Sequence, residues 1–268
     1  LLAILEVFDF MTIFKILFII ALLVILAAYI CYRIAFWAPK RVLDEDVQIH
    51  LPAGEQYLKV RTGIEKCVTD MLNRPFEPVT ITTFDGKKLY ARYYHVADGA
   101  PLQIQFHGYK SSAVLDFCGG SLYAGKIEHN ALVVDQRSHG RSEGKAITFG
   151  ILERKDVLSW IDYARSRFGE DVRIILAGLS MGAATVIMAA ALPLPANVKC
   201  ILADSPYSAP DEIIWQVCKD RHFPVKLVYP FIRFAARVFA GFNLEQYSAT
   251  AAASVSPVPI LLLHGDHD

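Results

Sequence analysis

The chain has 268 residues, and its 27 lysines and arginines balance its 27 aspartates and glutamates. Without net charge there is no electrostatic basis for a nucleic acid or an acidic polymer as partner. The cysteines are odd in number and widely spaced, which argues against a disulfide framework or a zinc site and predicts free, mostly buried thiols: Cys31, Cys67, Cys118, Cys200 and Cys218. The sequence holds no phosphate-binding glycine loop and no metal-ligand constellation, so we expect neither a cofactor nor a metal.

The first element is an apolar segment between Lys15 and Arg33, in which residues 16–32 include no charged or strongly polar side chain. At about 1.5 Å per residue, a helix of this length crosses most of a hydrocarbon core about 30 Å thick. We therefore predict a transmembrane helix over residues 13–36, which gives the protein a single N-terminal membrane anchor. Residues 1–12 form a leader of uncertain start, since the first methionine is Met11.

Two other interpretations of this segment remain open. A cleaved signal peptide usually has an apolar region of about 7–15 residues and a small-residue cleavage site. Here the flanking residues resemble an interfacial anchor instead: Arg33, Trp37, Lys40 and Arg41. A buried core helix would need an amphipathic stripe, which the segment lacks. The flanking cations favour, by a small margin, a cytoplasmic position for the rest of the chain.

Residues 37–78 are polar and mixed, and they predict a linker with one helix, from about Gly54 to Leu72, that packs on the edge of the following domain. From Val79 onward the pattern changes to short apolar runs. The first stretch predicts two antiparallel strands about the turn Asp85-Gly86, because glycine permits the positive φ that a tight hairpin needs.

Five further apolar runs are rich in β-branched residues and do not alternate with polar ones: LQIQFHG, ALVVDQR, VRIILAG, VKCILAD and VPILLLHGD. Strands buried on both faces have this composition, which is typical of a parallel sheet covered by helices. Between the runs we predict helices over residues 113–126, 151–168 and 182–191. This order predicts a doubly wound, mostly parallel α/β domain over residues 79–268, with ligands at the carboxyl ends of its strands.

Residues 207–247 break this rhythm with two aromatic-rich helical stretches where the next crossover belongs. We interpret them as a cap or lid inserted over the site. An ordinary crossover with a long helix is the alternative.

The pentapeptide GLSMG, residues 178–182, follows a buried strand and precedes an alanine-rich helix. In this setting G-x-S-x-G places a serine on a strained turn, and the flanking glycines, Gly178 and Gly182, avoid collisions with the neighbouring strand and helix. Ser180 is therefore the predicted nucleophile. The amino terminus of the following helix adds a dipole suited to developing negative charge.

A second motif, FHGYKSS, follows an earlier strand at residues 106–112. An acyl-transfer enzyme holds its oxyanion with two backbone N–H groups, one from the residue after the nucleophile and one from such a loop. We predict that these belong to Met181 and Tyr109, with His107 and Gly108 supporting the loop. His107 is interpreted as a brace and not as the catalytic base.

Two further sets of polar residues lie in loops that follow predicted strands. The loop DQRSHGRSEG contains Asp135, Arg137 and His139, which we interpret as a structural network, since arginine is a poor neighbour for a cation site. A serine nucleophile also needs a base oriented by an acid at the end of a later strand. The acids in such positions are Asp204, Asp266 and Asp268.

These motifs, FHGYKSS, DQRSHGRSEG, GLSMGA, DSPY and LLLHGDHD, in this order, resemble the α/β-hydrolase superfamily over residues 79–268. Within it, the pattern is similar to membrane-anchored bacterial proteins of the serine-aminopeptidase-like and BEM46-like group. The resemblance implies that Asp268 is the acid, that Asp266 is an intervening residue, and that Asp204 is the alternative, as in a lipase subgroup. The family's histidine follows one further strand, so we expect a truncated sequence whose last strand, helix and histidine lie beyond Asp268.

The expected function is that of a serine hydrolase that cleaves carboxylic esters of acyl or lipid-like substrates, nearly inactive in the truncated form. A serine peptidase or amidase is one alternative. The other is a membrane-tethered binding protein with a hydrolase fold and no turnover, since fold alone does not guarantee chemistry. A histidine encoded after Asp268 would favour the enzyme.

Overall fold

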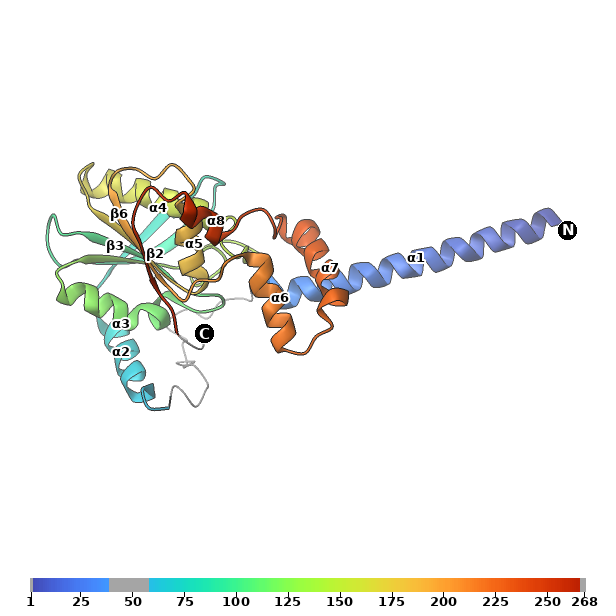
Figure 1. Cartoon of the computed structure of the whole chain (residues 1–268), viewed down its shortest axis with the longest axis horizontal. Coiled ribbons are helices and arrows are strands. Elements are labelled where there is room, and N and C mark those ends of the chain that lie inside the picture. Colours follow the sequence, from blue (N-terminus) through green and yellow to red (C-terminus); the bar gives the residue numbers. More distant parts are fainter. Residues whose placement is uncertain (1, 39–57, 266–268) are drawn as a thin grey trace.

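The computed structural model describes residues 2–38 and 58–265. At its centre is a seven-stranded sheet in the order β1-β2-β4-β3-β5-β6-β7 (Figure 1). The strands are β1 (Glu77–Thr82), β2 (Lys88–Tyr94), β3 (Leu102–Phe106), β4 (Asn130–Val134), β5 (Ile174–Leu179), β6 (Val198–Asp204) and β7 (Ile260–Leu263). The pairs β1–β2 and β2–β4 are antiparallel, and all other pairs are parallel. The predicted hairpin and the mostly parallel sheet are therefore confirmed, and Gly86 has the expected positive φ of 78°.

Helices cover both faces of this sheet (Figure 1). They are α2 (Arg61–Asn73), α3 (Ala113–Lys126), α4 (Glu153–Phe168), α5 (Met181–Ala189) and α8 (Ala249–Ser254). One apolar core lies under α4, α5 and α8, and a second lies under α2 and α3. Along β4 the two cores alternate, since Leu132 and Val134 belong to the first and Ala131 and Val133 to the second. The strand is buried on both faces, as its sequence predicts.

Four element predictions need correction. Helix α2 begins at Arg61, because residues 58–60 form a turn; residues 54–57 lie outside the described residues. Helix α4 begins at Glu153, two residues later than expected, since the Glu153 carboxylate accepts the N–H groups of Thr148 and Gly150 and closes a turn before the helix. Helix α5 begins one residue early and ends at Ala189. Strand β7 is largely exposed, because within the described part of the chain it is an edge strand.

The five cysteines are free thiols, as predicted, but they are less buried than expected. Only Cys118 and Cys218 are buried, whereas the other three are half-buried.

The N-terminal helix α1 (Leu2–Ala35) projects from the domain and is continuous across residue 12 (Figure 1). Its Met11–Ala35 segment contains an 18-residue stretch with a mean hydropathy of 2.9, of which only 6% is buried. A core helix would be mostly buried, so that interpretation is wrong for this fold. By length and composition the helix meets the requirements of a membrane span, and a signal sequence meets the same requirements.

Three helical elements stand between β6 and α8: α6 (Pro210–Asp220), α7 (Val225–Ala235) and the π-helix η3 (Ala236–Ala240). The short α8 packs on α5 as the crossover helix between β6 and β7. Of the preceding elements, α7 and η3 pack instead against the last turns of α1, around Ala28, Tyr32 and the following Phe36, and α6 adds Ile214 and Cys218 to the same cluster. We refer to α6, α7 and η3 together as the cap helices.

A buried arginine joins the loop after β4 to two other elements. Arg137 is 2% exposed and makes paired hydrogen bonds to Asp156 of α4, at 2.6 Å from Nε and 2.5 Å from Nη2. Its Nη1 also donates to Asp85 of the hairpin at 3.2 Å. In the same loop, Asp135 accepts the backbone N–H of Arg141, and burial raises the pKa of Asp135. These contacts are those of a structural network.

Removing this arginine should destabilise the fold strongly, because it leaves the Asp156 carboxylate buried without its partner. We expect Arg137→Met to lower the free energy of unfolding by about 3–5 kcal/mol in urea titrations of the detergent-solubilised protein. The double variant Arg137→Met/Asp156→Leu should recover most of this loss. Arg165→Met, which breaks an exposed pair with Glu170, is the control and should cost less than about 1 kcal/mol. Equal losses for the two single variants would contradict the role of Arg137.

Candidate active site

Ser180 occupies a strained turn between the end of β5 and the start of α5. Its backbone has φ 51° and ψ −113°, a conformation that residues other than glycine rarely adopt. The turn is held because Ser180 N–H donates to the Asp204 carbonyl at 2.8 Å, while its own carbonyl accepts from Ala184 N–H at 3.0 Å. The serine is exposed, and its Oγ has no hydrogen-bond partner among the described residues.

The two flanking glycines allow this turn. A Cβ on Gly182 would stand 1.8 Å from the Phe106 carbonyl oxygen of β3. A Cβ on Gly178 would stand 2.3 Å from the carbonyl oxygen of Gly182. Because α5 therefore touches β3 through its backbone, any side chain at either position would push the helix away from the sheet.

The loop after β3 runs beside this serine, since a Cβ on Gly108 would lie 3.5 Å from Ser180 Cβ. Its N–H groups are paired in turn: Gly108 donates to Asp116 at 2.6 Å, Lys110 to the imidazole of His139 at 3.1 Å, and Ser111 to the Gly108 carbonyl at 3.3 Å. The Tyr109 N–H finds no acceptor within residues 11–38 and 58–265.

Met181 provides a second N–H group of this kind. As the first residue of α5 it has no acceptor within the helix, and none elsewhere in the described ranges. The predicted pair of donors, Met181 and Tyr109, thus belongs to two backbone segments that meet at Ser180. Both groups are available to an anionic oxygen.

Two buried histidines fix the loop and are not available as bases. His107 Nε2 accepts from Gln136 N–H at 3.1 Å, so its Nδ1 carries the proton and donates to the Gly108 carbonyl at 2.8 Å. By the same reasoning, the His139 ring accepts from Lys110 through Nε2 and donates to the Arg137 carbonyl through Nδ1 at 3.0 Å. These are the contacts of bracing residues.

Sequence reasoning missed Asp116, whose carboxylate clamps the loop from α3. One oxygen accepts Gly108 N–H at 2.6 Å and the other accepts the Ser111 hydroxyl at 2.5 Å. The only signal in the sequence was an acidic residue in the first turn of a helix capped by Ser112. That pattern is explained equally well by helix capping and the helix dipole.

The Tyr109 side chain connects the same loop to α1, which the sequence did not indicate. Its hydroxyl donates to the Ala35 carbonyl at 2.7 Å, and its ring stacks on Phe149 at 5.0 Å. The neighbouring Lys110 ammonium donates to the Ile34 carbonyl at 2.8 Å. Burial raises the pKa of Tyr109 to about 12, so the hydroxyl keeps its proton across the physiological range.

Of the three predicted acids, Asp204 lies in the described part of the chain. Asp204 ends β6 next to the serine turn, because Leu179 of β5 is its partner in the parallel register. Its carboxylate is exposed and accepts the Ser205 hydroxyl at 3.2 Å. Asp266 and Asp268 lie outside the described residues.

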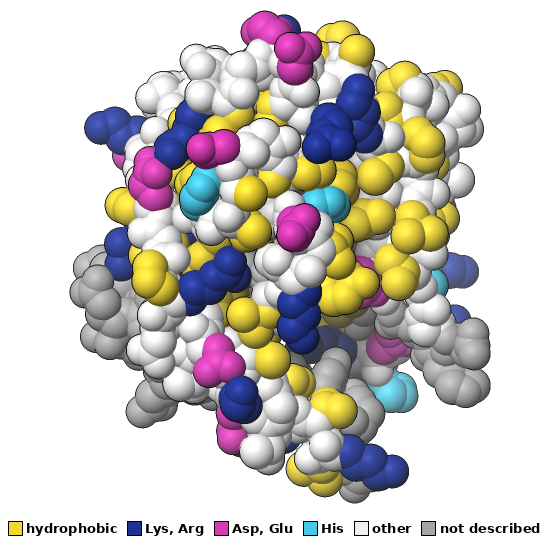
Figure 2. All heavy atoms as spheres, turned by 90° about the vertical axis from the view of Figure 1, so that its left-hand side faces the viewer, with side chains coloured by type: hydrophobic (Ala, Val, Ile, Leu, Met, Phe, Trp, Pro, Cys, Tyr) yellow, Lys and Arg dark blue, Asp and Glu magenta, His cyan; other side chains and the backbone are white. Residues whose placement is uncertain are grey.

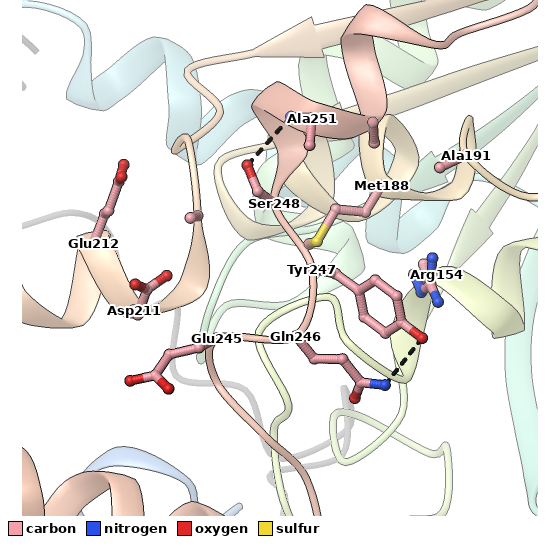
Figure 3. A pocket seen from close by; sticks show the side chains of 12 residues that line it. Arg154, Met188, Ala191, Asp211, Glu212, Glu245, Gln246, Tyr247, Ser248 and Ala251 are labelled. Carbon is pink, nitrogen blue, oxygen red and sulfur yellow. Dashed lines mark hydrogen bonds between the residues drawn. The ribbon is translucent and has the colours of Figure 1, made fainter.

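A separate hollow of about 420 Å³ lies between the far end of α5, the loop before α8 and the start of α6 (Figure 3). Ser180 does not line it, whereas Met188 and Ala191 do. Arg154 stands over the Tyr247 ring at 3.3 Å, which offsets part of the cost of burying its charge. We therefore place the candidate site at Ser180 and not in this hollow.

The chain is similar to several known proteins. A model of the alpha/beta hydrolase family matches residues 106–266. The uncharacterized protein YqkD of Bacillus subtilis is 25% identical over 140 residues, which cover 52% of this chain and 46% of YqkD. The uncharacterized protein YfhR of Salmonella typhimurium is 30% identical over 200 residues, which cover 72% of this chain and 64% of YfhR. The chain thus spans between 46% and 64% of the length of these curated relatives.

Solved structures share the fold. An esterase of Pyrococcus furiosus superposes with a TM-score of 0.58 at 22% identity, covering 85% of this chain and 76% of the esterase. An alpha-beta hydrolase from Vibrio vulnificus superposes with a TM-score of 0.56 at 22% identity, covering 80% of this chain and 70% of its own.

The serine turn makes a prediction about its glycines. Gly182→Ala should lower the free energy of unfolding by about 2–4 kcal/mol, because the new methyl group collides with the β3 backbone, which cannot yield as a side chain would. Gly119→Ala is the matched control: it lies on the exposed side of α3 with nothing within 4 Å, and should stabilise by about 0.5–1 kcal/mol. Chemical denaturation measures both, and a neutral Gly182→Ala would show that the helix does not depend on this contact.

Proposed function

Because the chain belongs to the alpha/beta hydrolase family, we propose that it is a serine hydrolase that cleaves carboxylic esters. The observation that carries the proposal is the exposed Ser180, held at φ 51° beside two backbone N–H groups without acceptors in the described residues. Ser138 and Ser205 also have positive φ, but Ser180 combines it with a ψ of −113°, outside the left-handed helical region, which supports a strained nucleophile turn.

The proposed first step is attack of Ser180 Oγ on the ester carbonyl carbon. The carbonyl oxygen becomes an oxyanion, which the N–H groups of Met181 and Tyr109 bind. Each such donor typically contributes about 10²–10³ in rate. The carbon–oxygen bond then breaks, the alcohol leaves with a proton, and the acyl group stays on Ser180 until water attacks it and restores the hydroxyl.

The proton needs a base, and in our proposal a histidine that follows Asp268 in the natural protein supplies it. This histidine takes the serine proton, returns it to the leaving alcohol, and activates the water of the second step. Asp268 orients it, and Asp204 is the alternative acid. In support, the two buried histidines nearest this site, His107 and His139, already use both ring nitrogens.

The proposed substrates are acyl esters with an apolar, lipid-like part. Supporting this, the side chains that adjoin the oxyanion loop are aromatic: Tyr109 stacks on Phe149, whose carbonyl accepts the Tyr207 hydroxyl at 2.9 Å. The same cluster continues through the cap helices to α1, which we propose to be a single membrane anchor. The similar fold of an esterase agrees with an ester substrate.

Fluorophosphonate labelling of the full-length protein, read by mass spectrometry, tests the nucleophile. We expect one adduct, on Ser180, and none in Ser180→Ala, whose esterase activity on short acyl esters should fall by about 10⁴–10⁶. Ser254→Ala, which changes an exposed serine on α8, should label and turn over like the parent protein. A folded protein that forms no adduct would refute the proposal and favour a binding role.

The identity of the acid can be tested separately. Asp268→Asn should lower kcat by about 10³–10⁴, because the asparagine no longer stabilises the imidazolium or fixes its tautomer. Asp204→Asn should cost less than about tenfold, since we assign no proton transfer to it. The reverse order, measured by steady-state kinetics on the full-length protein, would make Asp204 the acid.

A further inference from the structure

The cap helices α7 and η3 present an apolar stripe to solvent. Its members are spaced by three or four residues and therefore lie on one side of the helix. They are Leu227, Pro230, Phe234 and Val238. At the two ends of the stripe Leu227 is 66% exposed and Val238 56%, so its large apolar side chains face solvent over its whole length.

Cations border this stripe on one side. Lys226, Arg233 and Arg237 are exposed, and residues 225–240 contain no carboxylate. Arg233 shares an exposed ion pair with Glu245 at 3.2 Å, whereas Arg237 donates to the amide oxygen of Asn243 at 3.4 Å and forms no ion pair with a described residue. The two arginines and Phe234 line a shallow hollow of about 370 Å³ with mainly apolar walls. An apolar stripe with a cationic border is the pattern of a helix that lies in a membrane surface.

The packing of η3 on α1 determines where this stripe lies along the axis of α1. The Phe239 ring of η3 lies against Tyr29 at 5.6 Å and Tyr32 at 5.8 Å. Tyr29 stands four residues before Arg33, which corresponds to about 6 Å along a helix. The Arg33 guanidinium stacks on Trp37 at 4.6 Å, a pairing typical of the membrane interface. The cap is therefore level with the last turns of the apolar segment, and not with the sheet.

We infer that α7 and η3 lie in the surface of a bilayer beside α1, with the apolar stripe among acyl chains and the three cations at anionic phospholipid headgroups. Helices of this kind reach about 5–10 Å into the headgroup and acyl boundary, which matches the depth given by Tyr29. The inference rests on the membrane anchor of the proposed function.

The opposite end of the domain differs from the cap. Figure 2 shows acidic and basic side chains scattered together over that face, which is turned away from α1. A surface of mixed charge suits contact with water and carries no preference for an anionic bilayer. The arrangement of Figure 1 agrees, since α7 stands between the sheet and the free length of α1.

This position has a consequence for the substrate. The apolar cluster of the cap includes Phe149 and adjoins Tyr109, the residue whose N–H we assign to the oxyanion. This buried cluster joins α7 to the loop that flanks Ser180, so the inferred position of α7 brings that loop close to the bilayer surface.

Photocrosslinking of the full-length protein in nanodiscs of phosphatidylcholine and phosphatidylglycerol tests the inference. Phe234→benzoylphenylalanine should form covalent phospholipid adducts on irradiation, detected by mass spectrometry. Tyr123→benzoylphenylalanine is the matched control, since this aromatic residue of α3 is 63% exposed but lies away from the cap, and it should yield at least about tenfold less adduct. Phe18→benzoylphenylalanine, in the exposed part of α1, tests whether α1 itself lies in the bilayer.

The outcomes separate the cap from the anchor and from the enzyme. Lipid adducts at Phe18 but not at Phe234, equal adducts at Phe234 and Tyr123, or a covalent protein dimer at Phe234 would each overturn the inference while the anchor stands. No adduct at Phe18 would overturn both. None of these readouts depends on turnover, so a protein that fails fluorophosphonate labelling can still give the expected adducts.

The cations are tested by the composition of the adducts. At Phe234 we expect phosphatidylglycerol to exceed its share of the bilayer by about threefold or more. In Lys226→Gln/Arg233→Gln/Arg237→Gln the enrichment should disappear while the total yield remains within about twofold, because the apolar stripe is unchanged. An enrichment that persists in this variant would overturn the assignment of the headgroup site to these cations.

Discussion

The backbone contact between α5 and β3 at Gly182 is the constraint on which the candidate site depends. With no side chain between them, the helix begins directly above the end of the strand, and the turn that joins β5 to α5 must take the strained conformation seen at Ser180. The same contact sets the loop after β3 beside the serine. Two backbone segments that are far apart in sequence, the loop after β3 and the start of α5, therefore lie side by side at Ser180.

The loop keeps its shape because its polar groups, apart from the Tyr109 N–H, are held by side chains from three other segments. The Asp116 carboxylate of α3 accepts the Gly108 N–H and the Ser111 hydroxyl. The His107 ring donates to the Gly108 carbonyl, and the His139 ring accepts the Lys110 N–H. In both rings one nitrogen accepts a main-chain N–H, which requires the neutral form. Protonation of either ring would remove that acceptor and loosen the loop.

The strands and the serine turn could be predicted from sequence because their signals are local. Apolar runs without alternation mark strands buried on both faces, and G-x-S-x-G after such a run marks the turn. Helix starts were less predictable, since the start of α4 is set by the side chain of Glu153 folding back on Thr148 and Gly150. The exposure of β7 depends on its place at the sheet edge, which no residue of ILLL encodes.

Contacts between distant residues could not be predicted at all. Tyr109 and Ala35 are 74 residues apart, and nothing in FHGYKSS indicates that its tyrosine hydroxyl binds the end of the first helix. The cap was recognisable as an interruption of the strand–helix rhythm. Its packing on α1 was not predictable, because it depends on contacts of Ala28, Tyr32 and Phe36, which are spaced by four residues, with helices about 200 residues later in the chain.

That packing makes the last turns of α1 a part of the folded domain. The carbonyls of Ile34 and Ala35, which a helix end leaves unpaired, are satisfied by Lys110 and Tyr109. Phe36 fills the core between Phe149 and Phe242, with ring centroids at 5.9 Å and 5.3 Å. A recombinant version that lacks the apolar segment, residues 13–36, would therefore lose part of the cap's core and the acceptor of the Tyr109 hydroxyl. Solubility gained in that way would come at the expense of the loop that flanks Ser180.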